Sequence, residues 1–268
     1  MRGRCSGNGD SVLRFKSLGS GSTGNAAVVE SHDDKPSRLL IDCGFGLRHL
    51  LARLDSAGLR GNDIDAIFIT HEHGDHIGCA AAFAERYRIP LWMSAGTHAA
   101  IGSPPLDGLL RIARDGEEIT LGQMTVLPFT VPHDAKEPLQ LTCTRGSVKL
   151  GVLTDLGHAT SHVLSHLEAC STLLLEFNHD ADLLAASGYP DFLKRRVGGP
   201  YGHLSNDSAA QIAKEVGHSG LKTIVAAHLS LQNNSPALTL ASLSQAAVVV
   251  TNELVIADAA TGCDWIAV

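Results

Sequence analysis

The sequence predicts an α/β domain in which two mixed β-sheets pack face to face with helices outside. Two observations predict it. Short apolar runs typical of strands recur in both halves of the 268-residue chain, and helical patterns lie between them. No repeat, charge block or low-complexity linker interrupts this pattern. We therefore expect a single domain over residues 12–268, preceded by a polar, flexible leader at residues 1–11.

The first half of the chain begins with a hairpin and ends in a histidine-rich segment. A Gly/Ser loop at 19–24 joins two β runs, and leucines at helical spacing follow a third. The apolar run Ile64–Ile69 is typical of a buried strand. Strands are expected at 12–18, 25–31, 38–42 and 64–69, with a helix from Leu47 to Leu54.

The second half repeats the alternation of strands and helices. Asn206 is the expected N-cap of a helix, because asparagine accepts a hydrogen bond from the first helical turn. The expected elements are short strands from about 109 to 155, a helix near 160–169, a strand at 173–176, the helix that begins at Asn206, a strand at 223–227, a helix after Pro236 and two closing strands.

Composition narrows the class of protein. The hydrophobic fraction of 44% predicts a sizeable core, and a net charge of -7 argues against a non-specific grip on nucleic acid. The basic run Lys194–Arg196 is interpreted as a solvated face. No apolar run approaches about 18 residues, so no membrane association is expected. Six single cysteines are interpreted as reduced thiols, which predicts a cytoplasmic location. No obligate protein partner is expected.

The segment Thr70-His-Glu-His-Gly-Asp-His76 carries the clearest chemistry. It follows a predicted buried strand, so its polar side chains fall just beyond a strand end. Imidazole and carboxylate groups are the ligands that suit zinc and similar ions. Four such groups in six residues cannot all surround one ion. The simpler arrangement has two ions, one bound by His71 and His73 and the other by Asp75 and His76.

This segment resembles the HxHxDH hallmark of the metallo-β-lactamase superfamily, and further parts of the superfamily's pattern follow in order. They are IDCG with Asp42, VPHDA with His133, TDLG with Asp155 and AAHLS with His228. The resemblance covers roughly residues 13–267 and implies the αββα fold. It implies that His133 completes the first metal site, that Asp155 bridges the two ions, and that His228 completes the second. Asp42 and Thr70 would support these ligands from behind.

Local motifs sharpen the resemblance to the YycJ/WalJ-type subgroup of the superfamily, whose members look like nucleases. These motifs are SLGSGSTGN at 17–25, VPHDAKEP at 131–138, EFNHD at 176–180, GHLSN at 202–206 and HLSLQNN at 228–234. The implied cofactors are two divalent metal ions, zinc first, with manganese or iron as alternatives. The implied substrate is a phosphodiester in DNA or RNA, and the net charge of -7 favours attack at a strand end, as by a 5′-directed exonuclease.

The expected reaction is attack by a hydroxide that bridges the two ions. Asp75 and Asp155 are the expected catalytic carboxylates, and His203 is expected to donate a proton to the leaving oxygen. The predicted phosphate-binding groups come from the Gly/Ser loop and from the start of the helix near 206. They are Ser20, Ser22, His203, Ser205 and Asn206.

Two other functions stay open. A glyoxalase II-like hydrolase of thioesters or other small esters would use the same metal loop, and a non-catalytic binding protein could retain the fold. Among the remaining histidines, His158, His162 and His166 are interpreted as a solvent-facing stripe, because no carboxylate partner completes a metal site. His179 is kept as a minor candidate, since it follows a strand end.

Overall fold

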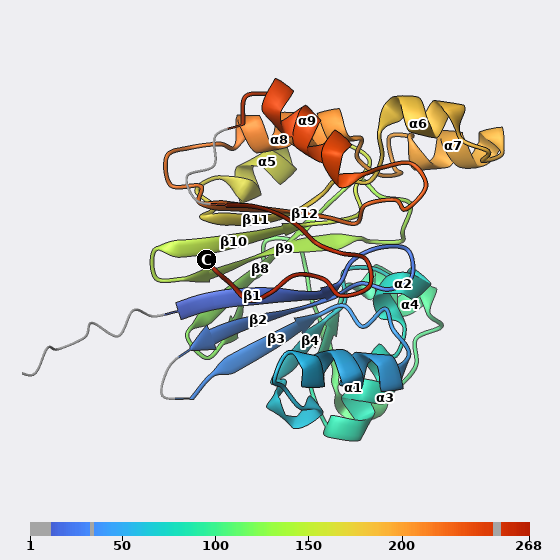
Figure 1. Cartoon of the computed structure of the whole chain (residues 1–268). Helices are drawn as coiled ribbons and strands as arrows, with labels where there is room; N and C mark the ends of the chain where they lie inside the picture. Colours follow the sequence, from blue (N-terminus) through green and yellow to red (C-terminus); the bar gives the residue numbers. More distant parts are fainter. Residues whose placement is uncertain (1–11, 33–34, 249–252) are drawn as a thin grey trace, which may run out of the picture.

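The computed structural model describes residues 12–32, 35–248 and 253–268, and it consists of two seven-stranded sheets packed face to face (Figure 1). The predicted leader at 1–11 lies outside the described residues. The two sheets are mixed and have helices on their outer faces, so the predicted αββα sandwich is confirmed. No helix in the described part is long and apolar enough to cross a membrane.

The first sheet is built mainly from the N-terminal half of the chain. Strands β14, β1, β2 and β3 are antiparallel neighbours, whereas β3, β4, β5 and β6 run parallel. In spatial order the strands are β14 (Ile266–Ala267), β1 (Val12–Gly19), β2 (Ala26–His32), β3 (Ser37–Ile41), β4 (Ala66–Phe68), β5 (Leu91–Met93) and β6 (Leu110–Ile112).

The second sheet repeats this arrangement with the C-terminal half. Strands β7 to β10 are antiparallel, and β10 to β13 are parallel. In spatial order they are β13 (Glu253–Ile256), β12 (Thr223–Ala227), β11 (Thr172–Glu176), β10 (Val148–Leu153), β9 (Leu139–Arg145), β8 (Met124–Thr130) and β7 (Ile119–Leu121).

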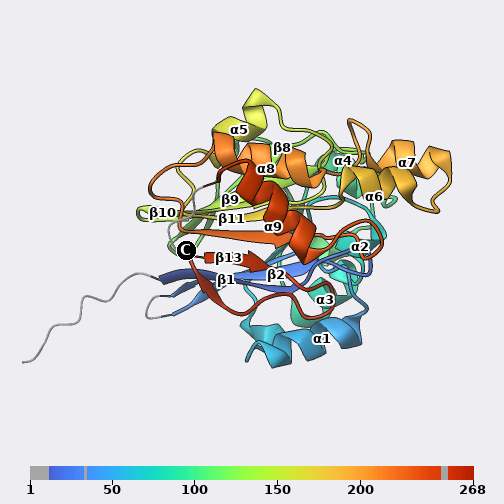
Figure 2. The same ribbon diagram turned by 45° about the horizontal axis from the view of Figure 1, so that its top comes forward.

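Helices cover both outer faces and gather at one end of the sandwich (Figures 1 and 2). The first sheet is covered by α1 (Leu47–Ser56) and α3 (Ala80–Tyr87), and the second by α5 (Ser161–Leu167), α8 (Asn206–Glu215) and α9 (Pro236–Gln245). At the common end lie α2 (Gly74–Ile77), α4 (Ala95–Ala100), α6 (Ala181–Ala186) and α7 (Asp191–Val197). Two short 3-10 turns, η1 (Gly61–Asp63) and η2 (Leu106–Gly108), complete the described elements.

Three apolar layers hold the sandwich together. Phe15, Val29 and Leu141 belong to the buried cluster between the sheets, while Phe83 of α3 and Phe177 after β11 belong to the two outer clusters. Each of these side chains is fully buried or nearly so. A fully buried large apolar side chain stabilises the fold by about 1.5–3 kcal/mol. The strand and helix patterns in the sequence therefore correspond to the two sheets and to the helices that cover them.

The parallel strands decide where polar residues meet. Parallel neighbours place their carboxyl ends at the same edge of a sheet, where open α/β sheets bind their ligands. Asp42 and His228 directly follow β3 and β12, and Asp155 lies two residues after β10; each has a left-handed backbone, with φ of 59°, 56° and 55° respectively. Such φ values are uncommon for residues other than glycine. The strand ends therefore turn sharply at the edge shared by both sheets.

One predicted helix boundary is wrong. Ser205, not Asn206, is the N-cap of α8, and its Oγ accepts a hydrogen bond from the backbone N–H of Ser208. Asn206 is instead the first helical residue and is 2% exposed. Serine and asparagine are comparable N-caps, so their order in the sequence could not decide between them.

Candidate metal centre

The strand ends bring all seven candidate metal ligands into one cluster. The seven residues fall in three groups, and a fourth group joins Asp155 and His228 to Glu176 and His203; within each group the possible ligand atoms lie within 4.8 Å of one another. The groups are His71 with His73 and His133, Asp75 with His76 and His228, and Asp155 with His71 and His76. Asp155 also lies close to His228, with 3.0 Å between Oδ1 and Nδ1. One carboxylate therefore stands between residues from both sheets.

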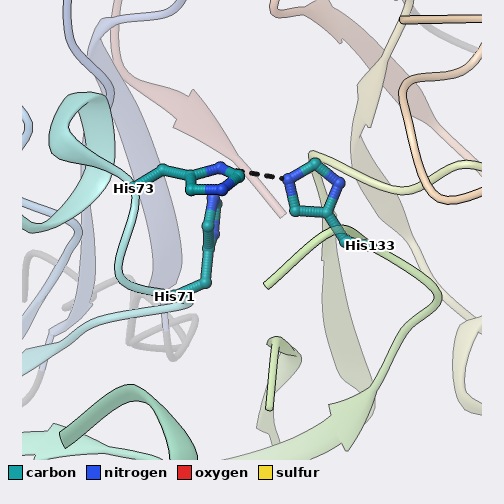
Figure 3. A group of neighbouring side chains, drawn as sticks. All are labelled: His71, His73 and His133. Atoms are coloured by element: carbon teal, nitrogen blue, oxygen red, sulfur yellow. Dashed lines mark hydrogen bonds between the residues drawn. The ribbon is translucent and has the colours of Figure 1, made fainter. Parts of the chain in front are cut away.

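The first group consists of three imidazole rings that point toward one another (Figure 3). His133 Nε2 lies 3.3 Å from His73 Nδ1, and the His71 ring centroid is 4.6 Å from that of His73 and 4.9 Å from that of His133. The Nδ1–H of His133 donates to the carbonyl oxygen of Gly202 at 3.0 Å. This bond fixes the tautomer and leaves the lone pair of His133 Nε2 directed at the group.

The remaining candidate ligands gather around Asp155. Its Oδ2 is 3.0 Å from His76 Nε2, and Asp75 Oδ2 is 3.8 Å from the same His76 atom. His76 and Asp155 are almost completely buried, whereas Asp75 is partly exposed. The carboxylates thus approach the imidazoles from two sides. Nitrogen and carboxylate oxygen donors of this kind suit a divalent ion such as zinc.

Asp42 and Thr70 lie behind the ligands. The Asp42 carboxylate accepts from Thr70 N–H at 2.9 Å and from the Thr70 hydroxyl, and it lies 2.7 Å from His76 Nδ1. Burial raises the pKa of Asp42, and the nearby His76 opposes this shift. Because the single hydroxyl hydrogen of Thr70 goes to Asp42, its oxygen accepts from His71 Nδ1–H at 3.0 Å. Both His71 and His76 are thereby held with Nε2 toward the centre.

The buried polar atoms fit a bound metal ion. Among the described residues, His71 Nε2 and Asp155 Oδ2 are buried without a hydrogen-bond partner. Such atoms are costly unless something else satisfies them. Burial, with a smaller effect from His76, lowers the pKa of His71 well below its ordinary value. His71 is therefore the neutral imidazole that a metal ion requires.

A cavity of about 360 Å³ opens onto this centre. Ser22 and His203 line it together with His73, Asp75 and Asp155. The other three residues predicted to bind substrate do not line it. Ser20 is buried and its Oγ accepts from the backbone N–H of His228, Ser205 caps α8, and Asn206 exchanges side-chain hydrogen bonds with Asn234.

Glu176 is the important residue that sequence reasoning missed. Its fully buried carboxylate lies 2.7 Å from His203 Nδ1 and accepts from the backbone N–H groups of Leu156 and Leu204. Burial raises the pKa of Glu176, but His203 and His228 together outweigh this effect and lower the pKa to about 2. Burial lowers the pKa of His203, but Glu176 and Asp155 together outweigh this effect, so that the pKa of His203 is raised. A buried acid at a strand end within EFNHD was the available signal.

Asn25 was also missed, and His179 does not join the centre. The Asn25 side-chain amide donates to the Asp75 carbonyl at 3.2 Å and lies 3.0 Å from His76 Nε2. It therefore supports the metal loop from the Gly/Ser turn. His179 is buried beside Asn178 and belongs to none of the possible metal-binding groups found in the described residues.

Comparisons with known proteins agree with the fold and with the expected subgroup. The chain is 35% identical over 237 residues to exodeoxyribonuclease YycJ of Bacillus anthracis, an alignment that covers 87% of this chain and 88% of the relative. It is 30% identical over 258 residues to exodeoxyribonuclease WalJ of Streptococcus pneumoniae, with 94% and 92% covered. The resemblance to the YycJ/WalJ subgroup is thus confirmed.

Solved structures share the fold at lower identity. The metallo-beta-lactamase fold protein YhfI from Bacillus subtilis superposes with a TM-score of 0.73 at 19% identity, covering 96% of this chain and all of that one. The family model described as the metallo-beta-lactamase superfamily matches residues 19–228. The chain therefore belongs to the metallo-β-lactamase superfamily.

Proposed function

We propose that this protein is a metal-dependent nuclease that hydrolyses phosphodiester bonds in DNA from a strand end. Two relatives that align along most of the chain are named exodeoxyribonucleases. The observation that carries the proposal is the cavity, which is lined by candidate metal ligands, by His203, by the cation Arg196 and by the aromatic ring of Tyr189.

In this proposal two divalent ions occupy the centre. His71, His73 and His133 would hold one, Asp75, His76 and His228 the other, and Asp155 would contact both. When bound, such ions supply Lewis acidity, which produces hydroxide near neutral pH and offsets charge on a phosphoryl oxygen. Zinc fits the nitrogen-rich donor set, and manganese or iron are alternatives.

His203 is the proposed general acid. It lines the cavity, and its side chain is 22% exposed. The Glu176 carboxylate at 2.7 Å favours the protonated imidazole, as the raised pKa of His203 reflects. A protonated histidine beside the reacting phosphate can give its proton to the departing sugar oxygen. Glu176 positions His203 and keeps it charged, while its backbone hydrogen bonds fix the carboxylate itself.

The mouth of the cavity suits a nucleic acid strand. Arg196 lines the cavity and is held by Asp134, with 2.6 Å between Nε and Oδ2. Phe192 precedes Arg196 by one turn of α7, so both side chains lie on one face of that helix. Phe192 is 67% exposed, and Tyr189 lines the cavity. Exposed aromatic rings beside a cation are typical of sites where bases stack.

The reaction can be tested with purified protein supplied with zinc or manganese. Linear 5′-phosphorylated DNA should be degraded, and matched substrates should show the preference: 5′-hydroxyl DNA, RNA, circular DNA and a glutathione thioester. Equal cleavage of circular and linear DNA would contradict action from an end. Turnover of the thioester alone would replace the nuclease proposal with the small-ester alternative.

Two kinds of variant separate the centre from the mouth of the cavity. Asp75→Ala or His76→Ala should abolish cleavage of every substrate and lower the metal content, and full turnover by either would exclude the two-metal account. Phe192→Ala should remove stacking of about 1–3 kcal/mol per base and raise the KM for DNA about tenfold. It should leave hydrolysis of the small diester bis(p-nitrophenyl) phosphate unchanged.

A further inference from the structure

A second group of histidine and carboxylate side chains lies apart from the candidate metal centre. Asp115, in the turn before β7, faces His162 and His166 on α5, and one possible ligand atom from each residue lies within 4.8 Å of the others. We propose that Asp115, His162 and His166 form a surface binding site for a divalent transition metal ion, and that zinc is the preferred ion. This inference does not depend on the proposed nuclease activity.

The geometry comes from one helix and one turn. His162 and His166 are four residues apart on α5, so their side chains lie on the same helical face, and their ring centroids are 4.7 Å apart. Asp115 Oδ2 lies 3.0 Å from His162 Nε2. The expectation that these histidines have no carboxylate partner is therefore wrong, because the tertiary structure supplies the carboxylate from a distant turn.

His158 does not belong to this group. Helix α5 begins only at Ser161, and His158 Nδ1–H donates to the carbonyl oxygen of Pro200 at 2.8 Å. The regular four-residue spacing from 158 to 166 thus crosses the start of the helix. His158 is a neighbouring histidine outside the proposed site, which makes it a natural control.

Two of the three ligands are already fixed in place. The Thr130 hydroxyl donates to Asp115 Oδ2 at 2.6 Å, and the His166 ring stacks on Phe129 with 4.7 Å between centroids and an interplanar angle of 6°. Burial, followed by the nearby His162, lowers the pKa of His166 and favours the neutral ring that binds metals. Little side-chain freedom is then lost on binding, and this favours affinity.

An ion from solvent can reach this site. The side chains of His162 and Asp115 are 44% and 35% exposed, and both line an open cavity. Two imidazoles and one carboxylate prefer zinc, nickel, cobalt or copper, whereas magnesium and calcium prefer oxygen ligands. A bound ion would connect α5 to the turn before β7, and through Thr130 to the end of β8, which continues toward His133.

Calorimetric zinc titration of the metal-loaded protein tests the site. The wild type should bind one more equivalent of zinc than Asp115→Asn and His162→Gln, and magnesium should not compete for it. The control His158→Gln removes a histidine from the same surface and should bind as many equivalents as the wild type. Zinc should also raise the Tm of the wild type further than that of the two variants.

Because the measurement is a difference between variants, the number of ions at the candidate centre does not affect it. All substituted side chains are at the surface, and circular dichroism would verify that each variant folds. Equal zinc stoichiometry in the wild type, Asp115→Asn and His162→Gln would overturn the inference. So would loss of the same equivalent in His158→Gln. His166→Gln provides an independent third variant with the same expected loss.

Discussion

Substitution of Asp42 by asparagine is expected to weaken metal binding about 10- to 100-fold without disrupting the fold. Asp42 Oδ2 and His76 Nδ1 are 2.7 Å apart, and their side chains are 4% and 0% exposed. Asparagine has the same shape and tolerates the left-handed φ of 59° at this position. Its oxygen can still accept from Thr70 N–H, so the loop keeps its anchor.

The magnitude follows from the lost hydrogen bond. Asparagine would direct an N–H group at His76 Nδ1–H, or force the hydrogen of His76 onto Nε2, where it would block the metal. A hydrogen bond to a charged group contributes about 1.5–3 kcal/mol, and every 1.4 kcal/mol is about tenfold in affinity. The estimate from this single bond therefore agrees with the range expected for residues that orient metal ligands.

Competition with a chromophoric zinc chelator would measure the affinity, and thermal unfolding of the metal-free protein would verify the fold. Asp264→Asn is the matched control, because that carboxylate is fully exposed and pairs with Lys16 at 3.2 Å, outside the metal-binding groups. It should bind zinc as the wild type does. Wild-type affinity in a folded Asp42→Asn variant would refute the orienting role of Asp42.

Three further predictions concern protons and stability. In the metal-free protein, burial lowers the pKa of His228, but Asp155 and Glu176 together outweigh it and raise the pKa to about 10; metal binding should therefore release a proton and weaken as the pH falls below about 10, as calorimetry in different buffers would show. Glu176→Gln should lower the pKa of His203 and shift the alkaline limb of the kcat profile about 1–2 units to lower pH, and an unmoved limb would exclude His203 as the acid. Glu30→Gln breaks a buried pairing with two arginines and should reduce the free energy of unfolding by about 1.5–3 kcal/mol in urea titrations, with unchanged kcat. Burial raises the pKa of Glu30, but the two arginines outweigh burial, so the pKa lies below its ordinary value. The difference in unfolding free energy between the wild type and Glu30→Gln should therefore shrink as the pH falls through that lowered pKa.

Local patterns in the sequence were sufficient for the architecture. Strand and helix periodicities depend on neighbouring residues, and the apolar run before His71 correctly indicated a buried strand that ends at the metal loop. The predicted element boundaries were less exact: Asn206 was predicted as the N-cap of α8, whereas the N-cap is Ser205. Two adjacent residues with similar capping chemistry cannot be distinguished without the backbone conformation.

The sequence by itself determined the types of the candidate metal ligands, their order and their positions after strand ends. Only the tertiary structure decided which side chains face one another: Glu176 with His203, and Asp115 with His162. The physical reason is that these partners come from separate strands, turns and helices, so no sequence spacing records their distance. Parallel strand ends bring Asp42, Asp155 and His228 to one edge, and the packing of two sheets then turns separate motifs into a single centre.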